Sequence, residues 1–272
     1  MPRSGSHYLR AAIGSGGGIV SLDEPFNPDL GDRPYRFDRF LRDRILADPS
    51  WRMDAETADA AVAEYFDRLV REGGGRPVLV DIKDDQLRVL DWPATGASSE
   101  PRVMRHILKS GYRIVRLERR DLLAQYASIR RAVKTGEWVM TDDAHPGAIS
   151  IRLDYERTRR HLAMTGETGH DIRRWIRHHP AVLTLTYETM LADDRLTEAA
   201  RSGLTEFLGA PVVDDGKRMP RKLAPPLDRL VANLPEIRAR LAEDGLAWLC
   251  DLEADGFSND DLAKTVAPPS ML

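Results

Sequence analysis

Residues 2–9 of the 272-residue chain read Pro2-Arg3-Ser4-Gly5-Ser6-His7-Tyr8-Leu9, a short polar loop that runs into an apolar helical pattern. This pattern suits an anionic ligand, because Gly5 permits a close backbone approach and the N–H groups at a helix start favour negative charge. The planar guanidinium of Arg3 also matches the oxygens of a phosphate or sulfate group. Taken alone, the octamer fits an ordinary turn before a helix equally well.

The rest of the chain alternates between strand-like and helix-like segments. Short runs suited to buried strands lie at 18–22, 77–82, 112–117 and 182–186, and apolar residues recur at helical spacing in 54–72, 99–109 and 121–134. Asp54 and Ser99 are the candidate caps of the first two helices, and Gly111 is the stop of the second. This alternation predicts an α/β fold with a P-loop-like, mostly parallel sheet flanked by helices. We expect a single domain over residues 1–272, with a helical insertion at about 30–75.

The start of the predicted sheet is anomalous. A phosphate-binding loop in an open α/β sheet normally follows a strand, so a further strand is expected before Pro2. Only Met1 precedes the loop in this sequence. Either the sheet lacks its first strand or the natural chain begins upstream of Met1, and of these alternatives we favour the second.

Composition narrows the class of protein. The 43 acidic and 40 basic residues give a net charge of −3, which predicts no general attraction to nucleic acid or to anionic membranes. The single cysteine, Cys250, excludes an internal disulfide and a cysteine-rich zinc site, and the pair His178-His179 lacks a third ligand, so no metal is expected. No apolar run reaches the ~18 residues of a membrane span. We therefore expect a cytoplasmic protein without membrane insertion.

A second motif lies where a predicted strand ends and a helix begins. The stretch 119–128 reads Arg-Arg-Asp-Leu-Leu-Ala-Gln-Tyr-Ala-Ser, and it places Arg120 eight positions before Ser128. The two side chains would share a ligand only if the helix folded back toward the loop. A charged strand–helix junction is the ordinary alternative.

Together these motifs resemble the sulfotransferase superfamily, whose members take a sulfuryl group from 3′-phosphoadenosine 5′-phosphosulfate. Residues 2–6 match the family's loop type Pro-Arg/Lys-Ser-Gly-Ser/Thr, and Arg120 with Ser128 match its Arg–Ser pair. Leu185-Thr186-Tyr187-Glu188 and the segment 204–209 resemble later family segments. The closer likeness is to bacterial carbohydrate sulfotransferases, including those that sulfate nodulation factors and trehalose.

The resemblance implies roles for particular residues. The 5′-phosphosulfate would be held by Arg3, Ser4, Gly5, Ser6, His7 and Tyr8. The 3′-phosphate would be held by Arg120 and Ser128, and a late basic segment with Arg221 and Lys222 would close the nucleotide site. Glu24 would be the general base, with Arg3 and Lys83 assisting at the sulfuryl group. The acceptor would be a hydroxyl of a carbohydrate or glycolipid, no metal would be needed, and a homodimer is left open.

Each role has a simpler alternative. Glu24 qualifies as a base provided that burial raises its pKa toward working pH, and otherwise it is a solvated loop acid beside Asp23. His7 is the rival base, since histidine titrates near neutrality. Lys83 is otherwise a solvated surface residue, and the basic run 217–222 is otherwise a charged loop.

Other classes of protein fit less well. A P-loop kinase would need Gly-x-x-x-x-Gly-Lys-Ser/Thr, whereas the glycine run 14–18 is followed by Ile19. That run does not open a helix after a strand, which disfavours a dinucleotide-binding protein. A catalytically impaired nucleotide-binding protein of the sulfotransferase fold remains an alternative.

Overall fold

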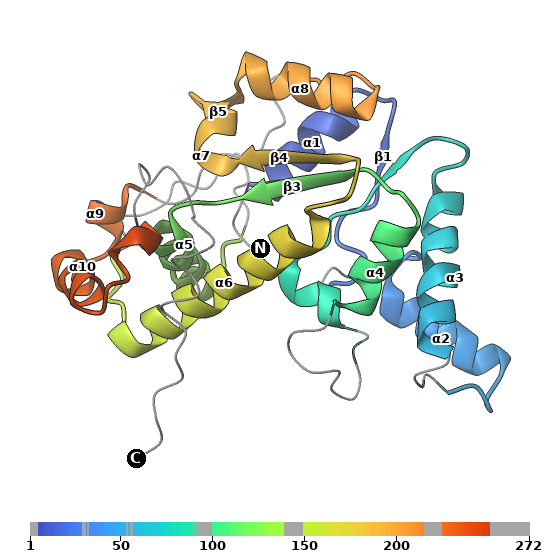
Figure 1. Ribbon diagram of the computed structural model, residues 1–272, viewed down its shortest axis with the longest axis horizontal. Coiled ribbons are helices and arrows are strands. Elements are labelled where there is room, and N and C mark those ends of the chain that lie inside the picture. The colour runs from blue at the N-terminus through green and yellow to red at the C-terminus, as the bar shows by residue number, and fades with distance from the viewer. Residues whose placement is uncertain are drawn as a thin grey trace. The chain divides into compact units, whose positions relative to one another are not determined.

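The computed structural model describes residues 5–28, 31, 33–52, 54, 57–89, 91, 100–138, 149–214 and 225–250. Helices and short strands alternate along this part of the chain, as predicted for an α/β fold (Figure 1). The elements of its first half are α1 Ser6–Ser15, β1 Val20–Ser21, α2 Phe37–Ala47, α3 Thr57–Glu72, β2 Val78–Leu79, the 3₁₀ helix η1 Asp84–Arg88, α4 Arg102–Lys109, β3 Ile114–Glu118 and α5 Leu122–Thr135. Those of its second half are α6 Tyr155–Ile176, β4 Val182–Thr186, α7 Tyr187–Met190, β5 Leu191–Ala192, β6 Arg195–Leu196, α8 Glu198–Leu208, α9 Leu227–Leu230, α10 Leu234–Glu243 and the 3₁₀ helix η2 Ala247–Cys250.

The chain packs as two compact units. Unit 1 comprises the described residues within 1–117, 171–185 and 189–219, and unit 2 comprises those within 118–170, 186–188 and 220–272. The helical character expected at about 30–75 is present in α2 and α3. A single domain with an insertion there stays a prediction.

The four predicted strands form two separate pairs. β1 and β2 are parallel, with Val20 opposite Val78 and Ser21 opposite Leu79. β3 lies beside β4, and Figure 1 draws their arrowheads pointing the same way. Within the described residues no ladder joins β2 to β3, so the mostly parallel sheet is seen as two halves. The antiparallel hairpin of β5 and β6 was not predicted from the sequence.

The helix starts follow the local sequence. The Asp54 carboxylate accepts the N–H of Thr57 at 2.9 Å, as expected of the residue proposed to cap this helix. The Asp121 carboxylate accepts the N–H of Ala124 at 2.7 Å and caps α5. Gly111 has a φ of 69° just after α4, a left-handed conformation that ends a helix at little cost. The expected cap of α4 at Ser99 lies outside the described residues.

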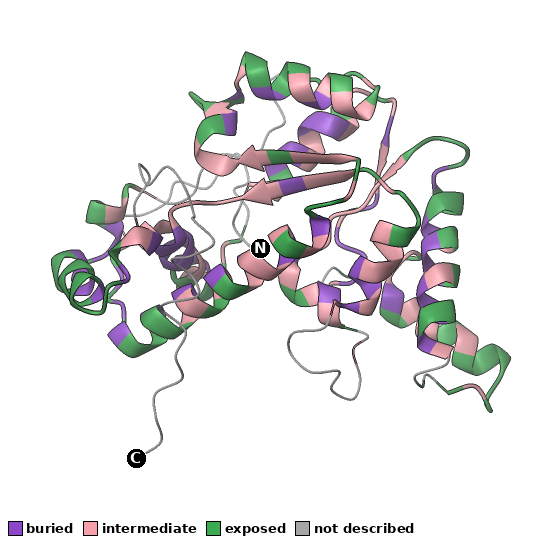
Figure 2. Cartoon of the chain, viewed as in Figure 1, coloured by how far each residue is buried: buried purple, intermediate pink, exposed green. Residues whose placement is uncertain are grey.

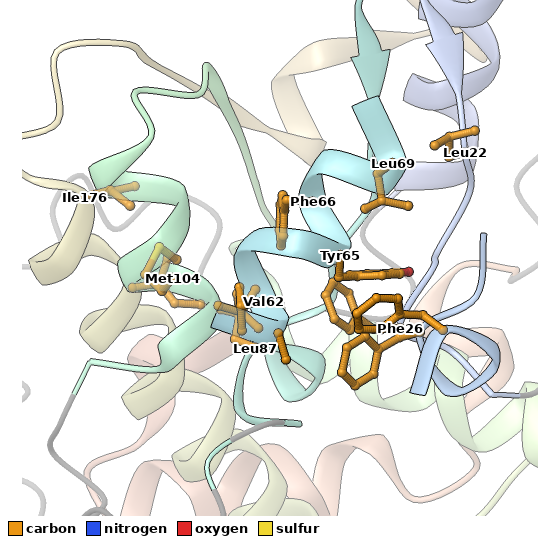
Figure 3. Packing of buried hydrophobic residues seen from close by; sticks show 14 residues of the cluster. Leu22, Phe26, Val62, Tyr65, Phe66, Leu69, Leu87, Met104 and Ile176 are labelled. Atoms are coloured by element: carbon orange, nitrogen blue, oxygen red, sulfur yellow. The ribbon is translucent and has the colours of Figure 1, made fainter. Parts of the chain in front are cut away.

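An aromatic cluster forms the core of unit 1 around the loop that follows β1. The ring centroid of Phe26 lies 5.3 Å from that of Tyr65 (Figure 3) and 5.3 Å from that of Phe37. The Tyr65 hydroxyl donates to the backbone oxygen of Tyr35 at 2.6 Å, which satisfies its polar end in the core. Burying Phe26 here fixes the loop that carries Glu24, two residues earlier.

Unit 2 is built around α5, the first part of α6, and α10. Leu162, Ile237 and Leu241 are fully buried there. The buried Asn233 side chain bonds both the N–H and the carbonyl of Leu153, each at 3.0 Å, so its polar groups are satisfied inside the unit. Across the described part of the chain, no helix combines the length and apolar character that crossing a membrane requires.

Candidate functional site

Glu24 lies in unit 1, three residues beyond the end of β1, and its side chain is only 6% exposed. One carboxylate oxygen, Oε1, lies 3.0 Å from the Lys83 ammonium and 3.4 Å from Nε2 of His7. The other, Oε2, accepts a hydrogen bond from the Asn27 amide at 3.0 Å and a long one from Gln86 at 3.5 Å. Glu24 is thus a buried, fully bonded carboxylate rather than a solvated loop acid.

Lys83 is the cation of this cluster, and it is buried rather than solvated. Its ammonium group donates to Ser6 Oγ at 2.6 Å and to Asp81 Oδ2 at 2.5 Å, besides its contact with Glu24. These three acceptors match the three donors of an ammonium group. Lys83 therefore links the carboxyl ends of β1 and β2 to the first residue of α1.

His7 is held on both ring nitrogens. The Arg10 guanidinium lies 3.1 Å from Nδ1, and because a guanidinium can only donate, Nδ1 accepts this bond. The proton of a neutral ring is then on Nε2, where it is donated to Glu24. In this arrangement His7 supports Glu24 and has no free nitrogen with which to act as the base itself.

Arg10 and two aspartates lie next to the cluster of Glu24, Lys83 and His7. Arg10 forms an ion pair with Asp23, and its Nε lies 3.5 Å from Asp81. Asp23 has a φ of 55°, a left-handed conformation that aspartate tolerates better than most residues, and its carbonyl accepts the N–H of Asp81 at 2.9 Å. This backbone bond extends the β1–β2 pairing as far as the residues that carry the charges.

The backbone of the loop before α1 uses the conformational freedom of Gly5. Gly5 has a φ of 88°, and α1 begins at Ser6 without a side-chain cap or an acidic residue in its first turn. The start of α1 therefore keeps its partial positive charge next to the Ser6–Lys83 contact. Arg3 and Ser4 lie outside the described residues, as do Arg221 and Lys222.

The pKa of Glu24 moves in the direction opposite to that required by the sequence argument. Burial does favour the protonated form, but the bond from His7, the positive charge of Lys83 and the bonds from Lys83 and Asn27 outweigh it. Together they hold the pKa of Glu24 well below its ordinary range. At neutral pH the side chain is therefore ionised, and the partners that lower its pKa also make it a weak base.

Tyr8 takes part in the fold of unit 1. Its ring is buried, and its hydroxyl donates to the Asp214 carboxylate at 2.7 Å. Burial and the neighbouring Asp214 charge raise the pKa of Tyr8 above its usual value. These contacts place the hydroxyl in a structural bond, and its expected role at the donor stays a prediction.

The Arg120 motif lies in unit 2. Oε1 and Oε2 of Glu188 accept the backbone N–H of Arg120 at 3.2 and 3.1 Å, and Oε1 also accepts the N–H of Asp121 at 3.2 Å. Arg119 stacks on the Tyr187 ring, 4.6 Å from its centroid. Within the described residues the Arg120 guanidinium has no hydrogen bond or ion pair. Ser128 is buried on α5.

Sequence reasoning therefore found Glu24, Lys83, Ser6 and His7, which the structure brings together, and missed four residues around them. These are Arg10, Asn27, Asp81 and Gln86. Asp81 carried a signal, because a charged residue near the end of an otherwise apolar strand segment points to the sheet edge where ligands bind. Comparison of the chain with protein-family models, with curated proteins and with solved structures gave no match.

Proposed function

We propose that the protein is a sulfotransferase that moves a sulfuryl group from 3′-phosphoadenosine 5′-phosphosulfate to a hydroxyl of a carbohydrate or glycolipid. The observation that carries this proposal is the buried Lys83 ammonium, which bridges Ser6 at the start of α1 and the Glu24 carboxylate. A cation, a helix start and a carboxylate at one sheet edge supply the three elements that sulfuryl transfer needs. These are a grip on an anion, charge neutralisation at the leaving group, and a proton acceptor.

In the proposed reaction, the acceptor oxygen attacks sulfur as the bond between sulfur and the bridging phosphate oxygen breaks. The electron pair of that bond leaves with 3′,5′-bisphosphoadenosine, whose new negative charge Lys83 and the N–H groups of α1 would stabilise. Glu24 takes the proton of the acceptor hydroxyl. Transfer of a group between oxygens in this way depends mainly on positioning and electrostatics, as in phosphoryl transfer.

The bonding of Glu24 suggests how the donor would activate it. The phosphosulfate offers Lys83 and Ser6 several anionic oxygens, and it would draw the Lys83 ammonium away from the carboxylate. Losing that positive charge would remove two of the influences that oppose burial, the charge and the bond of Lys83, and would so raise the pKa of Glu24 while the bonds from His7 and Asn27 remain. Glu24 would then be a stronger base when the donor is bound than when it is absent.

The proposal keeps Arg120 and Ser128 as the contacts of the 3′-phosphate. The absence of an intramolecular partner for the Arg120 guanidinium among the described residues supports a role in holding a ligand, because buried or half-buried arginines usually pair within the fold. The backbone bonds from Glu188 fix the turn from which this side chain extends.

Calorimetric titration with 3′,5′-bisphosphoadenosine, beside AMP and Mg-ATP, tests the proposal. It should be run on this chain and on one extended upstream of Met1. We expect micromolar binding of the bisphosphate, with AMP much weaker, and a selective loss of bisphosphate affinity in Arg120→Ala. Failure of both chains to bind the bisphosphate would exclude a sulfotransferase. Preference for Mg-ATP would point to a kinase, and binding without sulfuryl transfer to any sugar acceptor would point to an impaired relative.

A further inference from the structure

Unit 1 contains a cavity of about 570 Å³ between its two strand pairs. One wall is the segment Val78–Asp84, which includes β2, and the facing wall is Arg113–Leu117, which includes most of β3. Apolar side chains close it from α1, α3, α4 and α6, among them Ile13, Leu69, Met104 and Ile172. An apolar cavity of about 150 Å³ already holds a benzene molecule, so this space is large enough for a piece of polypeptide.

The backbone on both walls presents unused sheet edges. In a parallel ladder the N–H and C=O groups of alternate residues point to opposite sides. Pro77, Leu79 and Asp81 bond toward β1, so Val80 and Ile82 point the other way. Within the described residues, the backbone of Val80 and of Ile82 makes no hydrogen bond.

The same rule applies to the opposite wall. The N–H of Ile114 donates to Ala181 at 2.9 Å, next to β4, so the backbone groups of Val115 and Leu117 point away from β4. Both residues line the cavity. Two parallel edges thus face one space, and each offers the donors and acceptors that one additional strand would use.

The apolar side chains of these strand segments are also less buried than those of central strands in parallel sheets. Val78, Leu79, Val80, Ile114 and Val115 are all only partly buried, and Figure 2 draws β3 largely in the intermediate class. Central strands of parallel sheets are apolar because both faces and both edges are covered. These residues have the sequence of central strands in the position of edge strands.

The start of α1 gives the direction of the missing element. Asp81, Lys83 and Asp84 follow β2 at the carboxyl end of that strand segment, where Arg116 pairs with Asp84 at 3.0 Å, whereas the lining residues Arg76 and Arg113 precede β2 and β3. A strand parallel to β2 and β3 would end at this side. Ser6 lies at the same side, because it bonds Lys83, so such a strand would end close to where α1 begins.

We propose that this cavity is the site of an inserted β-strand, an extended apolar segment of about five residues joined to the amino end of residue 1. The length follows from the five residues of β3. The segment runs parallel to β2 and β3, bonds both edges, and joins the two pairs into one continuous sheet in the order β1, β2, inserted strand, β3, β4. This assignment locates the strand expected before Pro2, and it stands whether or not the protein is a sulfotransferase.

The test extends the chain before Met1 with an apolar pentapeptide of valine, isoleucine and leucine followed by two glycines. The matched control carries the same extension with proline at its central position, because proline lacks the N–H that the site would bind and is excluded from central strands. Three properties are measured without any nucleotide: the thermal midpoint, amide exchange at Val80 and Val115, and fluorescence of a dye that binds apolar cavities.

We expect the apolar extension to raise the thermal midpoint by about 10 °C, to slow exchange at both amides by about tenfold or more, and to abolish dye binding. The proline control should resemble the unextended chain in all three. The inference is overturned if the two extensions act alike, or if the chain with the apolar extension binds the dye as strongly as the unextended chain. It is also overturned if the pentapeptide, added as a free peptide to the unextended chain, protects the amides and the joined pentapeptide does not.

Discussion

Glu24 in unit 1 and Glu188 in unit 2 are both carboxylates that follow a strand, yet they are held in different ways. Glu24 is bonded by the side chains of Lys83, His7 and Asn27, whereas Glu188 accepts the backbone N–H groups of Arg120 and Asp121 and has only a longer ion pair, 3.8 Å, with the side chain of Arg119. Side-chain donors can turn toward an arriving ligand, but backbone donors cannot leave without unfolding the turn. Glu24 is therefore suited to a change of state, and Glu188 to holding a loop.

The largest loss of stability should come from removing Lys83, the cation that pairs with Glu24. Lys83→Met leaves Glu24 and Asp81 buried without their shared partner, and we expect a loss of about 3 kcal/mol in the free energy of unfolding, measured by urea denaturation. Lys109→Met, at an exposed lysine of α4, should stay within about 0.5 kcal/mol of the parent. If the two variants lost the same stability, Lys83 would not be the centre of the cluster.

Removing the second carboxylate should cost less. Glu188→Ala leaves the N–H groups of Arg120 and Asp121 without their acceptor, and we expect a loss of about 2 kcal/mol on urea denaturation. Amide exchange at residues 120 and 121 should quicken in this variant, with no change at Val80. Unchanged exchange at residues 120 and 121 would contradict a structural role for Glu188.

Acid should weaken the bonding of Glu24. The folded-state pKa of Glu24 lies below its unfolded value of about 4.3, so its stabilising contribution is complete above that pH and is lost as the pH falls below it. Stability should therefore fall more steeply below about pH 4.3 in the parent than in Glu24→Gln, by up to about 1.4 kcal/mol per pH unit. Parallel curves from urea denaturation at pH 3 to 6 would refute the assigned direction.

A smaller effect is expected at Asp214, which combines both kinds of donor. Its Oδ2 accepts the hydroxyl of Tyr8 and the backbone N–H of Leu196. Tyr8→Phe removes only the side-chain donor, and we expect a loss of about 1 kcal/mol in the free energy of unfolding. A loss as large as that of Lys83→Met would mean that this bond, and not the Lys83 cluster, anchors α1.

Local features of the fold were predictable because they depend on neighbouring residues. The cap at Asp54, the glycine after α4 and the cores of all four predicted strands follow from such patterns. The pairing of the strands was not predictable, since it depends on contacts between distant segments. The separation into two pairs, with a cavity between them, appears only in three dimensions.

In the candidate site too, single residues were predictable and the contacts between distant residues were not. Lys83 and Glu24 were singled out through the family resemblance, but the condition set for Glu24, that burial raise its pKa, is not met. Burial was considered without the three partners that oppose it, and Lys83 is far from Glu24 in the sequence. Arg10 and Gln86 gave no signal, because a charged helix face and a polar 3₁₀ turn are common on protein surfaces.

The most direct test of the account is whether donor binding raises the pKa of Glu24. Calorimetric titration with 3′,5′-bisphosphoadenosine at about pH 5, in two buffers of different ionisation enthalpy, counts the protons taken up on binding. We expect the parent chain, with or without the upstream extension, to take up more protons than Glu24→Gln, the difference being the proton that Glu24 gains as Lys83 turns to the ligand. Equal uptake by parent and variant, or no binding by either, would contradict it.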